Sequence, residues 1–231
     1  SQNAWLDLNG CDLNGTVTVA DNAVLYCMDS QTDDYTIQDA KGYGQLTNVT
    51  GQVAAAENYL QVTQDGAISY HRVNLEIYAM TLRAANVGVY YKSHFAGDEV
   101  VAQQVESFGV ALSVVGAPTA ANLKSQCGYT TFTGFAAGEG ANSGNATGTL
   151  LRDIMKTTNT DKINARNASM AVYGRAYIKT ADGYVFGGVQ KRTLQEQVEA
   201  IDGMDEALKS QYAAAIDAAL AAIDNAEIAE L

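Results

Sequence analysis

Few residues in this chain could do acid–base or nucleophilic chemistry. The two histidines are His71 in ISYHRVNLEIY and His94 in YYKSHFAGD, and each lies in a strand-like alternation of apolar and polar residues. A catalytic triad would need one of them beside a serine or cysteine nucleophile and a carboxylate. Nothing in the order of residues singles out such a trio. We therefore predict a structural or surface role for both histidines, in a protein that is not an enzyme.

Carboxylates are the second source of possible chemistry. Paired carboxylates on a stack of strands could hydrolyse or eliminate polysaccharide, and the available acids are Asp7, Asp12, Asp29, Asp33 and Asp34. Asp7 and Asp12 recur in the turn sequence D-L-N-G, where aspartate commonly bonds its own backbone. We interpret these two as turn residues, and a polysaccharide-degrading enzyme is the least favoured function.

The same region is the weak candidate for a metal site. Asp29, Asp33 and Asp34 have the oxygen density for Ca²⁺, which takes about six to eight oxygen ligands, but they lack the spacing of a calcium-binding loop. A solvated turn is the favoured interpretation. Zinc is not expected, because the chain has no C-x-x-C pair and only two histidines. The glycines near residue 140 do not fit a nucleotide-binding pattern, so no cofactor is predicted.

The three cysteines, Cys11, Cys27 and Cys127, are too few for a dense disulfide framework. A Cys11–Cys27 bridge would close a loop of about 15 residues and add about 3 kcal/mol in an oxidising compartment. Two buried thiols are the alternative, and Cys127 would be unpaired in either case. Tyrosines offer a separate possibility, because aromatic rings can stack on sugars. The candidates for glycan contact are Tyr90, Tyr91, Tyr129 and Tyr184, although most strand tyrosines pack on a half-buried face.

The elements that must position these residues fall into three regions. Residues 1–84 are short apolar strings cut by Gly, Asn and Asp, which is typical of strands and turns. L-D-L-N-G followed by T-V-T-V favours parallel β-rungs, similar to a β-helix, over hairpins. Residues 85–190 predict a small β-sandwich with one short helix in AGDEVVAQQVESFG, ended by Gly109. Its residues 134–149 predict a mobile loop, and Asp182-Gly183 predicts a hairpin.

Residues 191–231 predict an acidic helical tail. Thr193 and Glu196 form a capping box, and Leu194, Val198 and Ile201 form a face that would dock on the sandwich. A second helix is expected from about residue 205. From residue 194 onward, nine acidic side chains accompany one lysine. The predicted fold class is therefore mainly β, with a partial parallel β-helix-like rung layer, a β-sandwich and an α-helical tail.

Five segments together resemble, in the same order, the C-terminal regions of large secreted surface proteins of anaerobic Gram-positive gut bacteria. They are L-D-L-N-G at 6–10, L-Y-C-M-D-S-Q-T-D-D-Y at 25–35, A-M-T-L-R at 79–83, F-G-V-A-L-S at 108–113 and Y-G-R-A-Y-I-K-T-A-D-G at 173–183. The resemblance implies the last turns of a right-handed parallel β-helix, an immunoglobulin-like module, and an extracellular or cell-surface location. It implies no catalytic activity. Members of that family carry further strand repeats ahead of L-D-L-N-G, whereas this sequence starts almost on it.

The first rung is therefore expected to expose apolar side chains and unpaired backbone groups. The side chains predicted to form this surface are Trp5, Leu6, Leu8, Leu13, Val17 and Val19. We expect another copy of the chain to cover it, head to tail, in a non-enzymatic structural subunit that forms an oligomer or a cell-surface filament. The alternative is a carbohydrate-binding or adhesion module that contacts a host or cell-wall glycan. The net charge of −12 argues against nucleic acid and membrane surfaces as partners.

Overall fold

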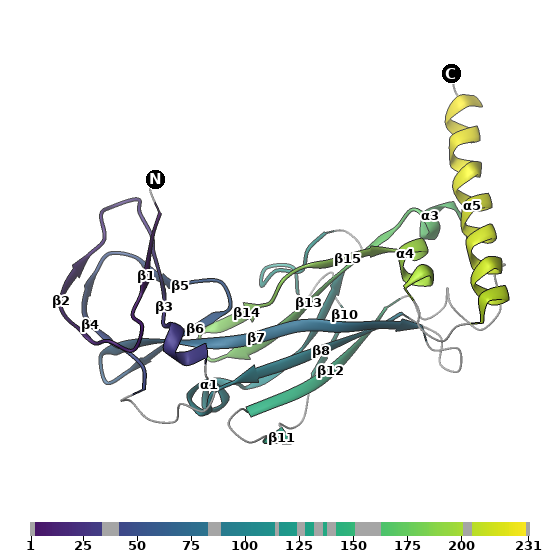
Figure 1. The fold of residues 1–231 in the computed structure, drawn as a ribbon. Coiled ribbons are helices and arrows are strands. Elements are labelled where there is room, and N and C mark those ends of the chain that lie inside the picture. Colours follow the sequence, from purple (N-terminus) through teal and green to yellow (C-terminus); the bar gives the residue numbers. More distant parts are fainter. Residues whose placement is uncertain are drawn as a thin grey trace.

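The computed structural model describes residues 3–33, 42–82, 89–113, 116–123, 128–131, 136–137, 142–150, 163–200 and 205–229. Strands in several sheets make up most of this part of the chain, and helices are few, as the sequence predicts. Figure 1 shows the first strands at one end of the molecule and the last helix at the other. None of the described helices combines the length and the hydropathy needed to cross a membrane.

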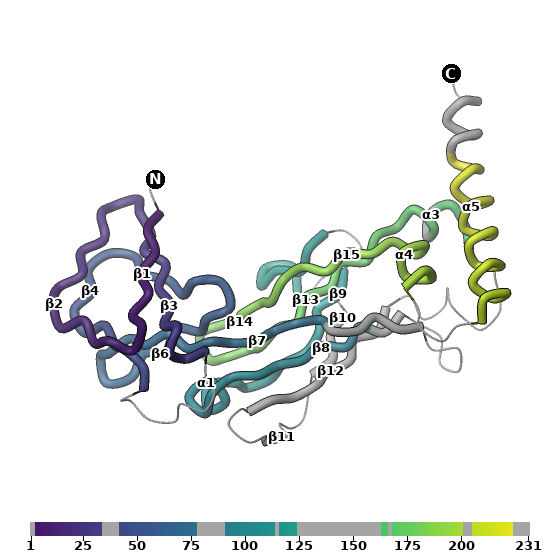
Figure 2. The backbone as a smooth tube through the Cα atoms, in the orientation of Figure 1, coloured from purple at the N-terminus to yellow at the C-terminus, as the bar shows by residue number. Residues whose placement is uncertain are grey.

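The N-terminal layer is built from parallel strands. β1 (Ala4–Asp7), β3 (Leu25–Met28) and β5 (Val53–Ala55) form one sheet in that order, and β2 (Leu13–Thr18) pairs with β4 (Leu46–Thr50) in another. Figure 2 shows the coiling path that brings β1, β3 and β5 side by side. The predicted parallel pairing is therefore observed for β1 to β5, but residues 59–64 of the same predicted region pair antiparallel with residues 67–72, so the preference for rungs over hairpins is wrong there. The apolar side chains between these strands form a core of Leu8, Cys27, Leu46, Ala56, Tyr59 and Tyr70.

The long strand β7 (Ala67–Leu82) connects this layer to the rest of the molecule. Its first part pairs with β6 (Tyr59–Gln64) and touches β4 at Ile68, and its second part pairs with β8 (Val89–Gly97). The resulting seven-stranded sheet has the order β11-β12-β8-β7-β4-β2, with β6 also on β7. Strands from the predicted regions 1–84 and 85–190 thus share one sheet.

A five-stranded antiparallel sheet, called the second sheet below, faces the seven-stranded sheet. It consists of β10 (Gly128–Thr131), β9 (Ser107–Ser113), β13 (Ala171–Thr180) and β14 (Gly183–Phe186), with β15 (Gln190–Thr193) paired to β13. The predicted hairpin is confirmed, because Thr180 pairs with Gly183 across a two-residue turn and Gly183 has a φ of 136°. The core between the sheets contains Leu60, Val62, Val73, Leu75, Phe95, Val101, Phe108, Ala176 and Ile178.

Two local predictions needed correction. The predicted short helix exists as α1 (Glu99–Gln104), but it ends well before Gly109 because Val105 is extended and the chain enters β9 at Ser107. The segment 134–149, predicted as a mobile loop, contains β11 (Ala136–Ala137) and most of β12 (Asn142–Leu150), which pairs with β8 along its whole length. A strand ladder is made by backbone groups, so small side chains do not prevent it.

Helices cover the far end of the sandwich. α3 (Ala165–Ala168) precedes β13, whereas α4 (Leu194–Glu199) and α5 (Glu206–Ala229) follow β15, and Figure 1 shows α4 and α5 beside each other at that end. The Thr193–Glu196 capping box is present as predicted. The predicted docking face is also present, since Leu194 and Val198 are buried, whereas Ile201 lies outside the described residues. The helices share a core with sheet residues; its buried members are Tyr91, Val110, Leu112, Ala168, Val172, Leu194, Val198, Tyr212 and Ile216.

Candidate functional site

The outermost strands of the N-terminal layer are paired on one side only. Among the described residues, β1 pairs with β3 alone and β2 pairs with β4 alone. The amides of Ala4 and Leu8 donate to the carbonyls of Val24 and Met28, at 3.3 and 2.9 Å. Because backbone groups alternate in direction along a strand, the N–H and C=O groups of Trp5 and Asp7 point to the outer edge. This layer therefore offers a row of free ladder positions.

Exposed apolar side chains accompany this edge. Trp5 is 65% exposed and Leu13 is 39% exposed, and Val189, elsewhere in the chain, is the third large apolar residue of the described part with such exposure. The Trp5 ring stacks on Tyr26 of β3, with centroids 5.7 Å apart and planes 24° from parallel. An aromatic stack thus ends at Trp5, on the outermost strand.

The other side chains predicted for this surface differ in exposure. Leu6, Val17 and Val19 are half-buried. Leu8 is only 5% exposed and belongs to the core of the layer, so its assignment to the self-association surface is wrong. It lies at the corner after β1, where the chain turns from one sheet toward the other and carries the side chain inward.

Carboxylates hold the successive turns of the layer together. Asp7 Oδ1 accepts hydrogen bonds from the amides of Asn9 and Ser30, at 3.0 and 2.9 Å, and Asp12 Oδ1 accepts from the amide of Gln45, at 3.1 Å. Burial alone would raise the pKa of Asp7, but the hydrogen bonds from Ser30 and Asn9 outweigh it and hold the pKa below its usual value. The predicted role of bonding the local turn backbone is confirmed for Asp7, whereas the observed bond of Asp12 goes to the next turn of the layer.

Asp29 also links successive turns of the layer, but in its interior. It is fully buried, and its carboxylate accepts hydrogen bonds from the amides of Gly10, Gln31 and Gly44. At Gly44 the backbones approach so closely that a Cβ would lie 2.4 Å from the carbonyl oxygen of Cys11. This corner therefore requires glycine and a buried acceptor, and the prediction of a solvated turn is wrong for Asp29.

The calcium candidates are not assembled into a metal site. Asp29 is saturated by backbone donors, and Asp33 Oδ1 accepts a hydrogen bond from the Tyr59 hydroxyl at 2.8 Å. Burial, followed by that contact with Asp33, raises the pKa of Tyr59 to about 12. Asp34 lies outside the described residues. Within the described ranges, no group of three or more His, Cys, Asp or Glu side chains could hold a metal ion.

Cys11 and Cys27 are both free thiols, so the predicted bridge is absent. Cys27 points into the core between the parallel sheets and is fully buried, whereas Cys11 is exposed on the turn between β1 and β2. The alternative of two buried thiols is therefore correct for Cys27 and wrong for Cys11. Cys127 lies outside the described residues.

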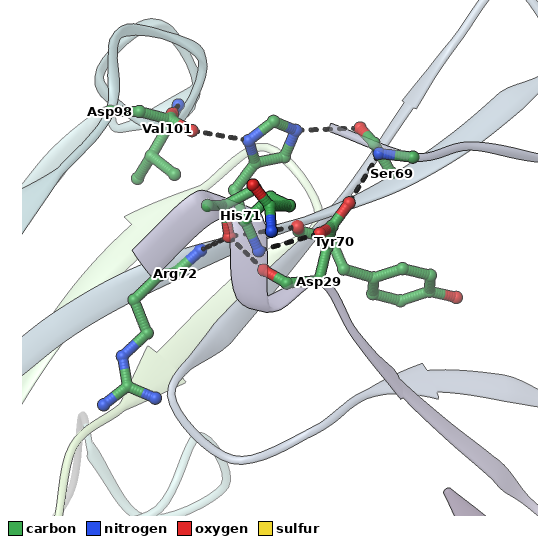
Figure 3. Close-up of polar contacts among 10 residues, drawn as sticks. Asp29, Ser69, Tyr70, His71, Arg72, Asp98 and Val101 are labelled. Carbon is green, nitrogen blue, oxygen red and sulfur yellow. Dashed lines mark hydrogen bonds and ion pairs between the residues drawn. The ribbon is translucent and has the colours of Figure 1, made fainter. Parts of the chain in front are cut away.

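The structure assembles a trio of chemistry-bearing side chains that the sequence did not single out (Figure 3). His71 Nδ1 lies 2.6 Å from Asp98 Oδ2, and His71 Nε2 lies 2.9 Å from Ser69 Oγ. The order carboxylate, imidazole, hydroxyl is that of a catalytic triad. Ser69 and His71 are two residues apart on β7, which places both side chains on one face of the strand.

This trio is closed to substrate in the observed conformation. His71 and Asp98 are fully buried, Ser69 is 7% exposed, and the Tyr43 ring packs edge-on against the imidazole with centroids 4.5 Å apart. Asp98 Oδ1 also accepts the amide hydrogen of Val101, at 2.8 Å, and so caps α1. The geometry thus fits a buried polar link that fixes α1 against β7, in line with the structural role predicted for His71. His94 lies half-buried on β8.

The four tyrosines predicted to contact glycans do not form one surface. Tyr91 is fully buried, and its hydroxyl accepts a hydrogen bond from Gln197 Nε2 at 2.7 Å, so its assignment to a contact surface is wrong. Burial raises the pKa of that hydroxyl. Helix α4 covers the sheet face that carries Tyr91, which strand alternation alone does not reveal. The side chains of Tyr90 and Tyr129 lie outside the described part, and Tyr184 is half-buried on β14.

Tyr184 lines a groove of about 540 Å³ between strands β6 and β14. Both strands are outer strands, because among the described residues β6 pairs only with β7 and β14 only with β13. The polar lining consists of Gln61, Thr63, Thr180 and Asp182, and Tyr59 is the second aromatic residue. This groove and the outer edge of the N-terminal layer are two candidate sites in the described part of the chain.

The chain was compared with protein-family models and with curated proteins. No protein-family model matches the chain, and no curated protein matches it.

Proposed function

We propose that this chain is a non-enzymatic, extracellular structural subunit whose parallel strands form a partial β-helix and whose outer edge joins copies head to tail. The observation that carries the proposal is Trp5, which is 65% exposed on a strand that pairs on one side only among the residues the structure describes. In this account the antiparallel sheets are an immunoglobulin-like module carried beside the strand layer, and the product is a cell-surface filament.

A second copy is favoured because the same sheet has two ends. β5 is the last strand of the sheet β1-β3-β5 and, among the described residues, pairs only with β3. Placing β1 of one copy on β5 of the next continues a parallel sheet in the same strand direction. The two surfaces differ, so the contact is heterologous and adds subunits without closing unless rotation forms a ring.

The free energy gained by covering this edge is enough for association but not for an obligatory assembly. Covering the exposed part of Trp5 removes apolar surface worth about 3 kcal/mol. Leu13 and the ladder hydrogen bonds of Trp5 and Asp7 add to this, while loss of rotational and translational freedom opposes it. We therefore expect weak, concentration-dependent assembly, with a Kd on the order of micromolar to millimolar.

Sedimentation velocity over a range of protein concentration, from about 1 µM to about 1 mM, tests the proposal. The parent chain should show a weight-average mass that rises with concentration. Trp5→Lys should stay monomeric, because a lysine on an edge strand opposes strand addition. Val189→Lys is the matched control, since it makes the same kind of change at a 45% exposed apolar residue away from β1.

A parent chain that remains monomeric over the whole range contradicts the proposal. So does assembly that Trp5→Lys and Val189→Lys change equally, because the contact would then not involve the outer edge of β1.

A further inference from the structure

The groove of about 540 Å³ lies where an edge strand of each sheet borders the open side of the sandwich. Leu60 and Val62 of β6 pack in the core between the sheets together with Val185 of β14. Because side chains alternate along a strand, Gln61 and Tyr184 point away from that core, each on the outer face of its own sheet. The groove is therefore bordered by the backbones of two edge strands and not by converging side chains.

The hydrogen-bond pattern of the β6–β7 hairpin leaves backbone groups of β6 unpaired on its outer side. The amide of Val73 donates to the carbonyl of Asn58 at 2.8 Å, so these two residues form a bonded pair of the ladder. Bonded and non-bonded pairs alternate in an antiparallel ladder, and the even-numbered residues of β6 therefore bond to β7. The N–H and C=O groups of Gln61 and Thr63 point to the outer edge, where no described strand pairs with them.

Strand β6 lacks the features that usually protect an edge strand. Such strands are commonly blocked by lysine, by proline or by a bulge. The sequence of β6, YLQVTQ, contains no proline and no charged residue, and its register with β7 is continuous from residue 59 to residue 64. Tyrosine, valine and threonine also favour extended backbone. The outer edge of β6 is therefore suited to strand addition.

The charges around the groove favour a basic partner. Asp182 lines the groove, Glu57 lies just before β6 and Asp65 just after it, and all three are exposed. None of the lining residues is basic. An acidic segment would therefore be repelled, whereas lysine or arginine side chains would be attracted. A second copy of this chain, with a net charge of −12, fits this groove less well than a basic segment of another protein.

We propose that an extended, basic segment of another protein adds as a strand to the outer edge of β6. Its backbone would bond to the free groups of Gln61 and Thr63, and a lysine or arginine would lie near Asp182. In strand addition the backbone hydrogen bonds provide affinity and the alternate side chains provide specificity. This contact is separate from the proposed self-association, because β6 belongs to the seven-stranded sheet and β1 and β5 belong to another.

An NMR titration at low ionic strength with a blocked peptide of about eight residues, in which lysine and valine alternate, tests the proposal. The peptide should bind with a Kd between about 10 µM and about 1 mM. Binding should protect the amides of Gln61 and Thr63 from hydrogen exchange, while protection of Leu60 and Val62, which already bond to β7, changes little. A counterpart with glutamate in place of lysine should bind about tenfold more weakly or less.

A fully N-methylated form of the basic peptide keeps the side chains and the charge but has no backbone donors, so it should not bind. Gln61→Pro removes the outward N–H without removing a bond to β7. We expect it to weaken binding by about tenfold or more while thermal unfolding stays close to that of the parent. The N-methylated peptide measures the same loss of backbone bonding without a change in the protein.

Asp182→Lys should weaken binding of the basic peptide by about threefold or more. Asp21→Lys is the matched control, because Asp21 is also an exposed turn residue but does not line the groove. The proposal is overturned if the basic peptide does not bind, or if its N-methylated form binds equally well. It is also overturned if Asp182→Lys and Asp21→Lys have equal effects, or if the peptide protects the Tyr184 amide in place of that of Gln61.

Discussion

The two ends of the molecule differ in how far their apolar side chains are exposed to solvent. At the end formed by α4 and α5, Tyr212 and Ile216 are 4% and 0% exposed and cover sheet residues such as Val110 and Leu112. At the end formed by β1 and β2, Trp5 and Leu13 remain 65% and 39% exposed. Figure 1 shows these ends on opposite sides of the sandwich.

This difference in exposure distinguishes a covered end from an uncovered end. Burying a large apolar side chain is worth about 1.5 to 3 kcal/mol, so helices that cover one end stabilise the subunit itself. The uncovered end combines apolar side chains with free ladder positions, and single exposed apolar residues do not normally come with such an edge. The helical end is thus covered by the chain itself, whereas the strand end carries the surface that the proposed assembly would cover.

The largest effect should come from the sandwich that holds the two ends apart. His71→Leu leaves Asp98 buried without its imidazole partner, and we expect a loss of about 3 to 5 kcal/mol in the free energy of unfolding, measured by urea titration. Glu106→Gln, which breaks the exposed ion pair with Lys179, is the control and should leave stability unchanged. A small effect of His71→Leu would mean that the trio does not hold α1 against β7.

A serine-directed phosphonate should not label Ser69 in the folded parent chain.

The trio also marks the limit of what the sequence could predict. Thr193–Glu196 and Asp182-Gly183 are local patterns, and both were found because their partners lie within three residues. Asp98 lies 27 residues from His71, and the contact depends on the β7–β8 register, in which Val73 pairs with Gly97. A Ser-x-His alternation on one strand and an aspartate at the start of a helix were the available signals, but neither sets the register.

Other differences have equally specific causes. Parallel pairing in the N-terminal layer was predicted from a D-L-N-G corner followed directly by the β-branched run T-V-T-V, although that pattern does not give the 21-residue spacing between β1 and β3. The burial of Leu8 and Tyr91 did not follow, since alternation shows that a strand has two faces and not which face another element covers. β12 was missed because its Gly, Ala and Asn side chains carry no apolar pattern, whereas its pairing uses the backbone alone.

A smaller effect on the free energy of unfolding should distinguish the helical end from the strand end. Ile216→Ala opens a cavity in the helical core and should cost about 2 to 5 kcal/mol in unfolding free energy. Leu13→Ala, at the exposed end, should cost no more than about 0.5 kcal/mol in the monomer. Urea unfolding of both variants at low concentration measures the contrast. Equal losses would contradict the comparison, because Leu13 would then be supported by the subunit itself.

The smallest expected effect concerns pH and the corners of the open layer. The folded pKa of Asp7 lies below its usual value, so its contribution to stability is present above the unfolded pKa and is lost as pH falls through the folded pKa. Asp7→Asn should therefore be slightly less stable than the parent at neutral pH, and the gap should close progressively as pH falls below about 4. Thermal unfolding at a series of pH values measures the gap. A gap that is constant with pH would show that the charge of Asp7 does not matter.

Amide hydrogen exchange of β1 tests the central claim most directly. The amides of Ala4 and Leu8 already donate within the subunit, whereas those of Trp5 and Asp7 face the outer edge. We expect Trp5 and Asp7 to exchange fast in dilute solution and to become protected as concentration rises, while protection of Ala4 and Leu8 changes little. If the Trp5 and Asp7 amides exchange equally fast at every concentration, no strand is added at this edge and the account is wrong.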